Sequence, residues 1–276
     1  MININDIAKN LELKDDVWYC KTHSSISYPE EGNELCFEIE ESSFWFTHRN
    51  TCIVEVVKKF PPPSNVIFDI GGGNGYVSQA LIKNGLNAFL VEPGSTGIKN
   101  AKKRGLRNLI CSRLEDAGFR QKSLPSIGLF DVIEHIEEDY KFLGLVRDLL
   151  VPAGKIYITV PTYKFLWSVD DATSGHFRRY RRNELVLQFE NLGFNIDYFT
   201  YFFSILPLPI FMFRTIPSKF IKIKRKDYTE NLHQHIIHPK FINDFLIKIW
   251  HIEQDRIKKQ KYIPLGSSCI IVATIY

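Results

Sequence analysis

The feature that most constrains this chain is a short apolar segment that runs directly into a cluster of glycines. Val66–Ile70 has the composition of a buried strand, four of the next five residues are glycine, and a helix is predicted to follow over Tyr76–Asn84. Glycine lets the backbone turn sharply and approach a ligand where a Cβ atom would clash. The start of the next helix offers unpaired N–H groups and the positive end of its dipole. This order predicts a ligand-binding loop.

Strand and helix signals alternate along the rest of the chain. Strands are predicted at Asn65–Ile70, Ala88–Val91, Asn108–Cys111, Ser126–Asp131, Lys155–Val160 and Ser267–Ile275, and helices at Thr51–Phe60, Tyr76–Asn84, Ser95–Arg104, Glu138–Leu150 and Asn183–Asn191. The alternation indicates βαβ units, which build a parallel, doubly wound α/β sheet. Such sheets bind ligands at the carboxyl ends of their strands, which is where the glycine turn lies.

Composition narrows the class of protein. Of 276 residues, 45% are hydrophobic and 24% charged, as in soluble globular proteins and unlike disordered or fibrous ones. A net charge of +4 is too mild to indicate a nucleic-acid partner. The five cysteines are widely spaced and do not indicate a disulfide framework. The N-terminal residues lack an apolar signal segment, so we expect a cytoplasmic protein.

Three classes of ligand use glycine loops of this kind. The phosphate-binding P-loop requires G-x-x-x-x-G-K-[ST], which is not present at this loop. The dinucleotide fingerprint requires G-x-G-x-x-G, and its third glycine would fall at Tyr76. Glu92 ends the next strand, at about the 20-residue spacing that suits an acceptor for ribose hydroxyls. The pattern fits best a ligand with a nucleoside and an amino-acid tail but no pyrophosphate.

The glycine loop, Glu92 and the segment Phe130–Ile136 together resemble the class I S-adenosylmethionine-dependent methyltransferases. The likeness covers about residues 65–160 and resumes at Pro264–Ser268. It implies a doubly wound, Rossmann-like seven-stranded sheet, mostly parallel with an antiparallel last strand, and S-adenosyl-L-methionine as the cofactor. We expect an N-terminal extension or cap over residues 1–60 and a methyltransferase domain over 61–276, with an insertion at about 198–262 before the last strand.

The same resemblance implies a cofactor site at the ends of the strands. Asp69, Gly71, Gly72 and Gly73 would line the methionine part, Glu92 and Pro93 the ribose, Arg113 and Leu114 the adenine, and Phe130 and Asp131 the sulfonium side. The family often has an aspartate where Arg113 stands, which leaves the adenine contact open. Arg49, in the segment Ser43–Asn50, would reach the methionine carboxylate, with Trp45 and Phe46 as a lid; simple aromatic packing is the alternative.

Candidate catalytic residues gather after the predicted fifth strand. Gly175-His176-x-Arg178-Arg179-Tyr180 resembles the motif of a methyltransferase subgroup whose substrates are largely unassigned. We interpret His176 as a candidate base, Arg178 and Tyr180 as acceptor-binding groups, and His135, after Glu134, as a second catalytic candidate. In the alternative interpretation Arg178 or Arg179 forms an ion pair with Asp170 or Asp171 that orders the loop, and His135 only packs or caps.

The insertion contains an uncharged run, Tyr198–Phe213, followed by a basic stretch at 214–226. Pro207 and Pro209 exclude a regular strand or an uninterrupted helix there, so only the first residues, up to about Phe203, should be buried sheet. The remainder is expected to form a lid over an apolar acceptor, or an exposed patch in peripheral contact with a membrane through 198–226. Packing of this segment on the core, with a solvated basic face, is the structural alternative.

No metal site is expected from the sequence. Cys20-x-x-His23 lacks a second pair of ligands, and His233, His235 and His238 lack a matching carboxylate. The predicted function is methyl transfer from S-adenosylmethionine to an O or N nucleophile of a small acceptor, either anionic or linked to a sugar or lipid. Two alternatives are a cofactor-binding module without turnover and an NAD-dependent oxidoreductase, against which Tyr76 argues.

Overall fold

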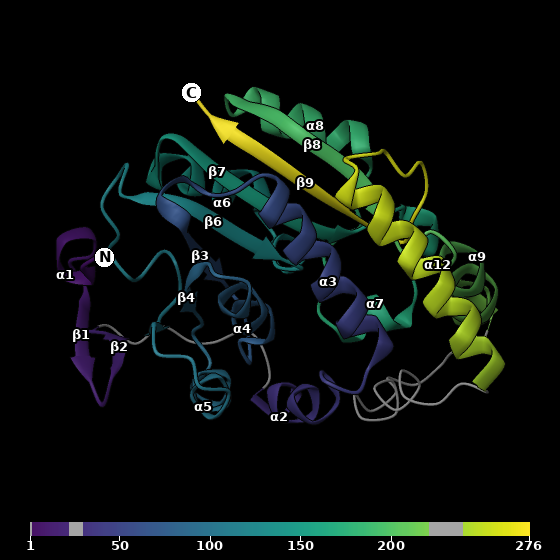
Figure 1. The fold of residues 1–276 in the computed structure, drawn as a ribbon, viewed down its shortest axis with the longest axis horizontal. Helices are drawn as coiled ribbons and strands as arrows, with labels where there is room; N and C mark the ends of the chain where they lie inside the picture. The colour runs from purple at the N-terminus through teal and green to yellow at the C-terminus, as the bar shows by residue number, and fades with distance from the viewer. Residues whose placement is uncertain (1, 22–29, 221–239) are drawn as a thin grey trace.

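One mixed sheet runs through the computed structural model, which describes residues 2–21, 30–220 and 240–276 (Figure 1). In those residues it has nine strands in the order β1-β2-β5-β4-β3-β6-β7-β9-β8. The strands are β1 (Leu11–Lys14), β2 (Val17–Cys20), β3 (Val66–Ile70), β4 (Asn87–Val91), β5 (Leu109–Cys111), β6 (Leu124–Phe130), β7 (Leu150–Pro161), β8 (Phe194–Phe202) and β9 (Ser268–Ile275). The last strand, β9, is antiparallel to both of its neighbours, as predicted.

The predicted count of seven strands is wrong, because β1 and β2 form a hairpin that extends the sheet. β2 pairs in parallel with β5, Val17 lying opposite Leu109. Asp15 and Asp16 connect the two strands with φ angles of 49° and 63°, the left-handed pair of a tight two-residue hairpin turn. A strand as short as β5 leaves an open edge, and the hairpin covers it.

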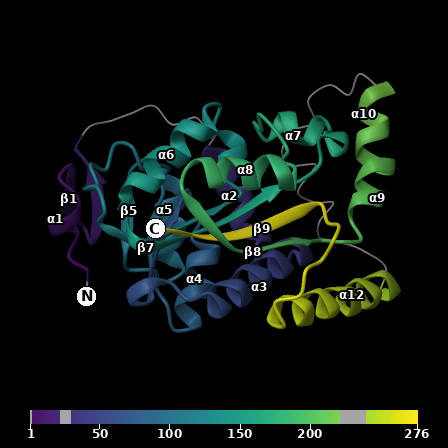
Figure 2. The same cartoon turned by 90° about the horizontal axis from the view of Figure 1, so that it is seen from above.

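Helices cover both faces of the sheet. In Figure 2, α3 (Phe44–Lys59), α4 (Tyr76–Lys83) and α12 (Lys240–Lys258) lie on one face, and α6 (Asp139–Leu149) and α8 (Arg182–Asn191) on the other. In the described part of the chain the remaining helices are α1 (Ile4–Ile7), α2 (Glu30–Ile39), η1 (Pro63–Asn65), α5 (Ser95–Lys103), η2 (Ile133–His135), η3 (Lys164–Leu166), α7 (Val169–Thr173), α9 (Pro207–Ile210), η4 (Phe211–Thr215) and α10 (Ile216–Phe220). Every residue of β3 and β6 is buried, as expected for central parallel strands covered on both faces.

Helix α3 is longer than the sequence predicts. We expected a helix only from Thr51, with the aromatic segment ahead of it, but the helix begins at Phe44 and includes that segment. Its first turns carry mixed aromatic and polar side chains, so the apolar periodicity that marks a surface helix is missing there. It ends at Lys59, and its cap residue, Phe60, directly precedes the three prolines.

The insertion leaves the sheet where expected. β8 ends at Phe202, and Phe202 and Phe203 are both fully buried. α9, η4 and α10 then follow one another as a single rod of helical turns beyond the end of β8 and the start of β9 (Figure 2). Its middle, η4, is a π-helical turn, which holds more residues per turn than an α-helix and keeps residues four apart on one face.

That spacing divides the rod into two faces. Pro207 and Thr215 are buried on the inner face, and the Thr215 hydroxyl donates to the carbonyl of Leu166 at 3.0 Å. The outer face carries Leu208, Met212, Phe213 and Ile216, all exposed. The rest of the basic stretch, residues 221–226, lies outside the described residues. Within the described ranges, no helix combines the length and apolar character needed to cross a bilayer.

Candidate active site

The glycine loop between β3 and α4 needs glycine for two separate reasons. Gly71, Gly73 and Gly75 have φ angles of 66°, 53° and 73°, which side chains with a Cβ rarely adopt. At Gly72 the obstacle is space, since a Cβ atom would lie 2.4 Å from Leu90 Cδ1. The backbone of the loop is thereby brought against the end of β4.

Glu92, the residue after β4, is bound to that backbone. One carboxylate oxygen accepts the N–H of Gly73 at 3.0 Å and the other accepts the N–H of Gly94 at 2.8 Å. Burial raises the pKa of Glu92 to about 7, against the two backbone hydrogen bonds, which lower it. Each oxygen keeps a second lone pair, so the carboxylate is fixed in position and still able to accept from a ligand.

Asp69, the fourth residue of β3, is the second buried carboxyl group at the loop. Its Oδ2 accepts the hydroxyl of Ser78 at 2.7 Å, whereas Oδ1 has no hydrogen-bond partner among the described residues. Burial raises the pKa of Asp69 to about 6. Two carboxyl groups with raised pKa values therefore flank the glycine turn, a pattern typical of functional sites.

Helix α2 covers this loop, which sequence reasoning missed. Asn74, in the loop, donates to the carbonyl of Asn33 at 2.8 Å, and Arg104 forms an ion pair with Glu40 at 2.8 Å. A Cβ atom at Gly94 would lie 3.2 Å from the side-chain nitrogen of Asn33. Asn74 was visible in the loop sequence, but nothing in the sequence of α2 identified its contact.

The predicted adenine residues, Arg113 and Leu114, lie just after β5. Leu114 is buried, whereas the side chain of Arg113 is largely exposed, 4.0 Å from Glu115. The carbonyl of Pro93 accepts the thiol of Cys111 at 3.7 Å. The groups that border this part of the loop are therefore backbone atoms and apolar side chains such as Leu114, and the Arg113 guanidinium contributes less.

Arg49 lies at the end of β6, beside the other two predicted cofactor residues. Its Nε forms a short ion pair with Asp131, and its Nη2 donates to the carbonyl of Phe130 at 2.7 Å. Asp131 has a φ angle of 58° and also accepts the hydroxyl of Thr159 at 3.0 Å. α3 thus delivers a buried guanidinium to the strand end that was predicted to face the sulfonium.

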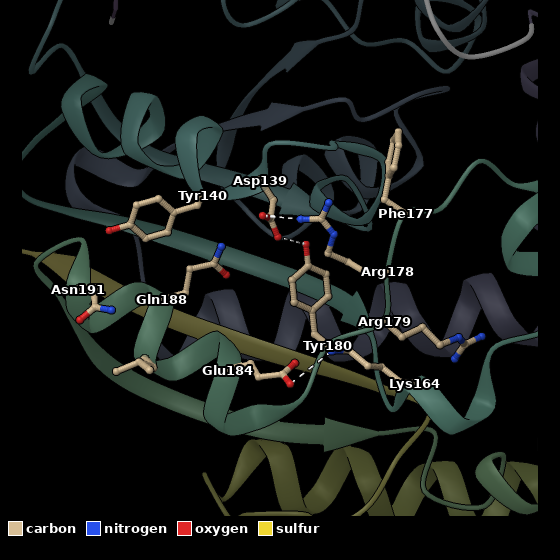
Figure 3. Close-up of a pocket in the computed structure, with 11 residues that line it drawn as sticks. Asp139, Tyr140, Lys164, Phe177, Arg178, Arg179, Tyr180, Glu184, Gln188 and Asn191 are labelled. Atoms are coloured by element: carbon tan, nitrogen blue, oxygen red, sulfur yellow. Dashed lines mark hydrogen bonds and ion pairs between the residues drawn. The ribbon is translucent and has the colours of Figure 1, made fainter.

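The arginines and the tyrosine of the loop after β7 contact acidic side chains of the protein itself. Asp139, the first residue of α6, accepts Arg178 Nη1 at 2.5 Å and the hydroxyl of Tyr180 at 2.7 Å (Figure 3). Burial and the hydrogen bond with Asp139 raise the pKa of Tyr180. Arg179 instead forms an ion pair with Asp171 at 2.7 Å, one of the pairs in the alternative interpretation.

A hollow of about 620 Å³ lies beside these residues, and Figure 3 draws the side chains that line it. It is lined by Asp139, Tyr140, Lys164, Phe177, Arg178, Arg179, Tyr180, Glu184, Leu187, Gln188 and Asn191. Neither the glycine loop nor Glu92 contributes to it. The hollow contains one buried carboxyl group, Asp139, which is paired with Arg178 and Tyr180, whereas the glycine loop brings Asp69 and Glu92 together with backbone donors.

The two predicted catalytic histidines lie together. The rings of His135 and His176 meet edge to face with their centroids 4.7 Å apart. His176 Nδ1 is 3.0 Å from Asp171 Oδ1, which also binds Arg179. Burial and then the neighbouring His176 lower the pKa of His135 to about 4, so its imidazole is neutral at neutral pH. Burial and the nearby Asp131 raise the pKa of Glu134.

Comparison with known proteins identifies the domain. A model of the methyltransferase domain family matches residues 46–198, more than half of the chain. The chain belongs to this methyltransferase family. It is 25% identical over 139 residues to a ubiquinone biosynthesis O-methyltransferase of Colwellia psychrerythraea, the match covering 44% of this chain and 56% of that protein. The methyltransferase chain therefore spans little more than half of that relative's length.

Solved methyltransferases share the fold. A SAM-dependent methyltransferase from Archaeoglobus fulgidus is 16% identical with a TM-score of 0.51, covering 82% of this chain and 94% of its own. Phosphoethanolamine N-methyltransferase 2 of Haemonchus contortus, in complex with S-adenosyl-L-methionine, is 17% identical with a TM-score of 0.55. The match covers 94% of this chain and 61% of that one. The prediction of a Rossmann-like fold is confirmed, and the family match confirms the prediction of a methyltransferase.

Proposed function

We propose that this methyltransferase transfers the methyl group of S-adenosylmethionine to an O or N nucleophile of a small acceptor. The observation that carries the proposal is the Glu92 carboxylate, held by the N–H groups of Gly73 and Gly94 at the mouth of the glycine loop. Fixed in this way, it is suited to accept hydrogen bonds from ribose hydroxyls. Of the three relatives, one is named an O-methyltransferase and another an N-methyltransferase, so both kinds of nucleophile stay in the proposal.

The rest of the cofactor site follows from the strand ends. We assign Asp69, Gly71, Gly72 and Gly73 to the methionine part, Glu92 and Pro93 to the ribose, Arg113 and Leu114 to the adenine, and Phe130 and Asp131 to the sulfonium side. Arg49 supports this arrangement. Its guanidinium forms an ion pair with Asp131 and lies close enough to Asp69 to lower the pKa of that carboxyl group, against the larger effect of burial. We assign this guanidinium to the methionine carboxylate.

The acceptor enters, in this proposal, beside His135 and His176. Both imidazoles lie after strand ends at the edge of the sheet where ligands bind, and Asp171 orients His176. A sulfonium methyl group is already activated, so the protein has only to align the nucleophile and manage its proton. Arg178 and Tyr180 support the loop through Asp139, which makes them positioning residues.

We also infer that the chain belongs to the subgroup with the Gly-His-x-Arg-Arg-Tyr loop. Each polar side chain of that motif has a defined partner: His176 and Arg179 bind Asp171, and Arg178 and Tyr180 bind Asp139. A motif in which every polar residue fixes the same loop is unlike a chance match.

The outer face of the α9–η4–α10 rod favours an acceptor with an apolar or lipid-linked part. Leu208 and Phe213 are 66% and 74% exposed, and Met212 and Ile216 extend the same face. Lys219 continues it with positive charge, as expected of a helix that rests on an anionic membrane surface. We propose peripheral contact with such a surface through this rod.

The test of the proposed function is transfer of labelled methyl groups from S-adenosylmethionine to phenols, phosphorylated amines and lipid extracts, offered separately. We expect label in one class only, and a His176→Ala variant should lose at least about tenfold of the rate while S-adenosylhomocysteine affinity stays within a few-fold. His251→Ala, an exposed histidine on α12, is the matched control. Tight cofactor binding without transfer to any class would favour a binding module without turnover.

A further inference from the structure

Three side chains capable of binding a metal converge at the proposed acceptor side. The donor atoms of Glu134, His135 and His176 all lie within 4.8 Å of one another. We propose that they bind a divalent transition-metal ion. Sequence analysis led us to expect no metal site, because Glu134 and His135 lie far from His176 in the chain and only the fold joins them.

Both imidazoles are oriented by neighbours. Asp171 accepts from His176 Nδ1 at 3.0 Å and is itself held by the N–H of Ser168 at 2.9 Å. This leaves Nε2 of His176 as the atom that would bind the metal. Backbone groups of Ser174 and Gly175 hydrogen-bond the ring of His135. Histidines that bind metals usually have their second ring nitrogen fixed by a carboxylate or backbone group in this manner.

Glu134 supplies an observation that does not depend on the histidines. It is almost completely buried, and its Oε2 has no hydrogen-bond partner in the parts of the chain that the structure describes. A buried carboxylate oxygen without a partner is costly. A cation between Glu134 and the two imidazoles would satisfy that oxygen.

The surrounding charges accommodate a cation. Asp131 and Asp171 lie near the cluster, and each is paired with one guanidinium, Arg49 and Arg179 respectively. The two ion pairs are neutral together, so Glu134 is the acidic group of the cluster that is left for a cation. A divalent ion bound by the Glu134 carboxylate would leave only a modest net positive charge there.

The donor set selects the kind of metal. Two imidazole nitrogens and one carboxylate oxygen suit Zn²⁺, Mn²⁺, Fe²⁺ or Co²⁺, whereas Mg²⁺ and Ca²⁺ prefer oxygen ligands alone. Three protein ligands leave an open position. If the proposed function holds, an acceptor hydroxyl bound there loses its proton to water, and its oxygen attacks the methyl carbon as the C–S bond breaks and its electron pair goes to sulfur.

The experiment is calorimetric titration of the chelator-treated full-length protein with Zn²⁺ and, separately, Mn²⁺. The starting variant carries His233→Gln, His235→Gln and His238→Gln, so that these histidines, which lie outside the described residues, contribute nothing to the binding that is measured. We expect one ion per chain. Glu134→Gln and His176→Ala should each weaken binding at least about tenfold, and Asp171→Asn by about tenfold or more, whereas His251→Ala should have no effect.

S-adenosylhomocysteine binding serves as the folding control for each variant. Failure of the starting variant to bind either metal, or equal binding by Glu134→Gln and His176→Ala, would overturn the metal site. Methyl transfer that persists after chelation would also overturn a catalytic role for the metal and leave the proposed function standing. Metal binding without any methyl transfer would instead count against the proposed function alone.

Discussion

Glu253 on α12 joins the insertion to the methyltransferase domain, and its replacement tests how the insertion is held. Its buried carboxylate accepts from His48 Nε2 on α3 at 2.8 Å, and from the N–H groups of Phe203 and Ser204 at 2.9 and 2.6 Å. The hydroxyl of Ser204 makes a further short hydrogen bond to it. One side chain therefore connects α12, α3 and the turn that follows β8.

Glu253→Ala should lower the free energy of unfolding by about 3–5 kcal/mol, because it leaves the buried donors of His48 and Phe203 without an acceptor, at about 1–3 kcal/mol each. A sum over every hydrogen bond to a charged group, at about 1.5–3 kcal/mol each, would overstate the loss. Ser204 is only half-buried, and its groups can turn to water. His48 and the N–H of Phe203 have no such route, since both residues are buried, and they account for most of the cost.

The measurement is urea denaturation followed by circular dichroism at pH 7. Asp255→Ala, an exposed acidic residue on the same helix, is the control and should change stability by no more than about 0.5 kcal/mol. A loss below about 1 kcal/mol for Glu253→Ala would refute the reasoning, because water would then have replaced the buried contacts at little cost.

The same variant has a defined pH dependence. Burial tends to raise the pKa of Glu253, but hydrogen bonds from His48 and Ser204 together outweigh it and hold the pKa below its usual range. A group with a lowered folded-state pKa contributes stability above its unfolded pKa and loses that contribution as the pH falls through the folded value. The difference between the wild type and Glu253→Ala should therefore be full near neutral pH and shrink as the pH falls below about 4.5.

Three further changes test other parts of the structure. Gly72→Ala should weaken S-adenosylhomocysteine binding at least about tenfold in calorimetry, because its methyl group would lie 2.4 Å from Leu90 Cδ1; unchanged affinity would mean that the loop has room to spare. Tyr180→Phe should cost about 1–2 kcal/mol in urea denaturation through the lost bond to Asp139, with cofactor affinity unchanged, and a loss of affinity would show that the loop supports the cofactor too. Phe213→Ser should reduce co-sedimentation with anionic vesicles without lowering stability, since its ring is 74% exposed, and equal sedimentation would remove the membrane proposal.

The elements near the glycine loop could be predicted because their sequence signals are local. The apolar run of β3, the four glycines and the position of Glu92 are each readable within a few residues of sequence. The geometry adds what a sequence cannot give directly, namely that Glu92 reaches back to the N–H of Gly73. Contacts of this kind across neighbouring strand ends follow from the fold once the strand order is known.

The features that were missed depend on partners distant in sequence. The β1–β2 hairpin is too short to stand alone and exists because β5 offers an edge. Asn33 on α2 reaches the glycine loop from a helix with no motif. Two segments distant in sequence bring Glu134 and His135 together with His176. Arg178 forms its ion pair with Asp139, whereas the sequence had suggested Asp170 or Asp171. In each case the sequence showed the residue types but not which distant residue each of them would contact.

The most direct test of the central claim is calorimetric titration of S-adenosylhomocysteine into the wild type and Glu92→Ala, with NADH as the competing ligand. Loss of a charged acceptor for the ribose should weaken binding by about 1.5–3 kcal/mol, roughly 10–150-fold. Because burial places the pKa of Glu92 near 7 in the unliganded protein and hydroxyl donors favour the charged form, wild-type affinity should rise between pH 6 and pH 8, and Glu92→Gln should abolish that rise. NADH binding without S-adenosylhomocysteine binding, or equal affinity in Glu92→Ala, would contradict the account.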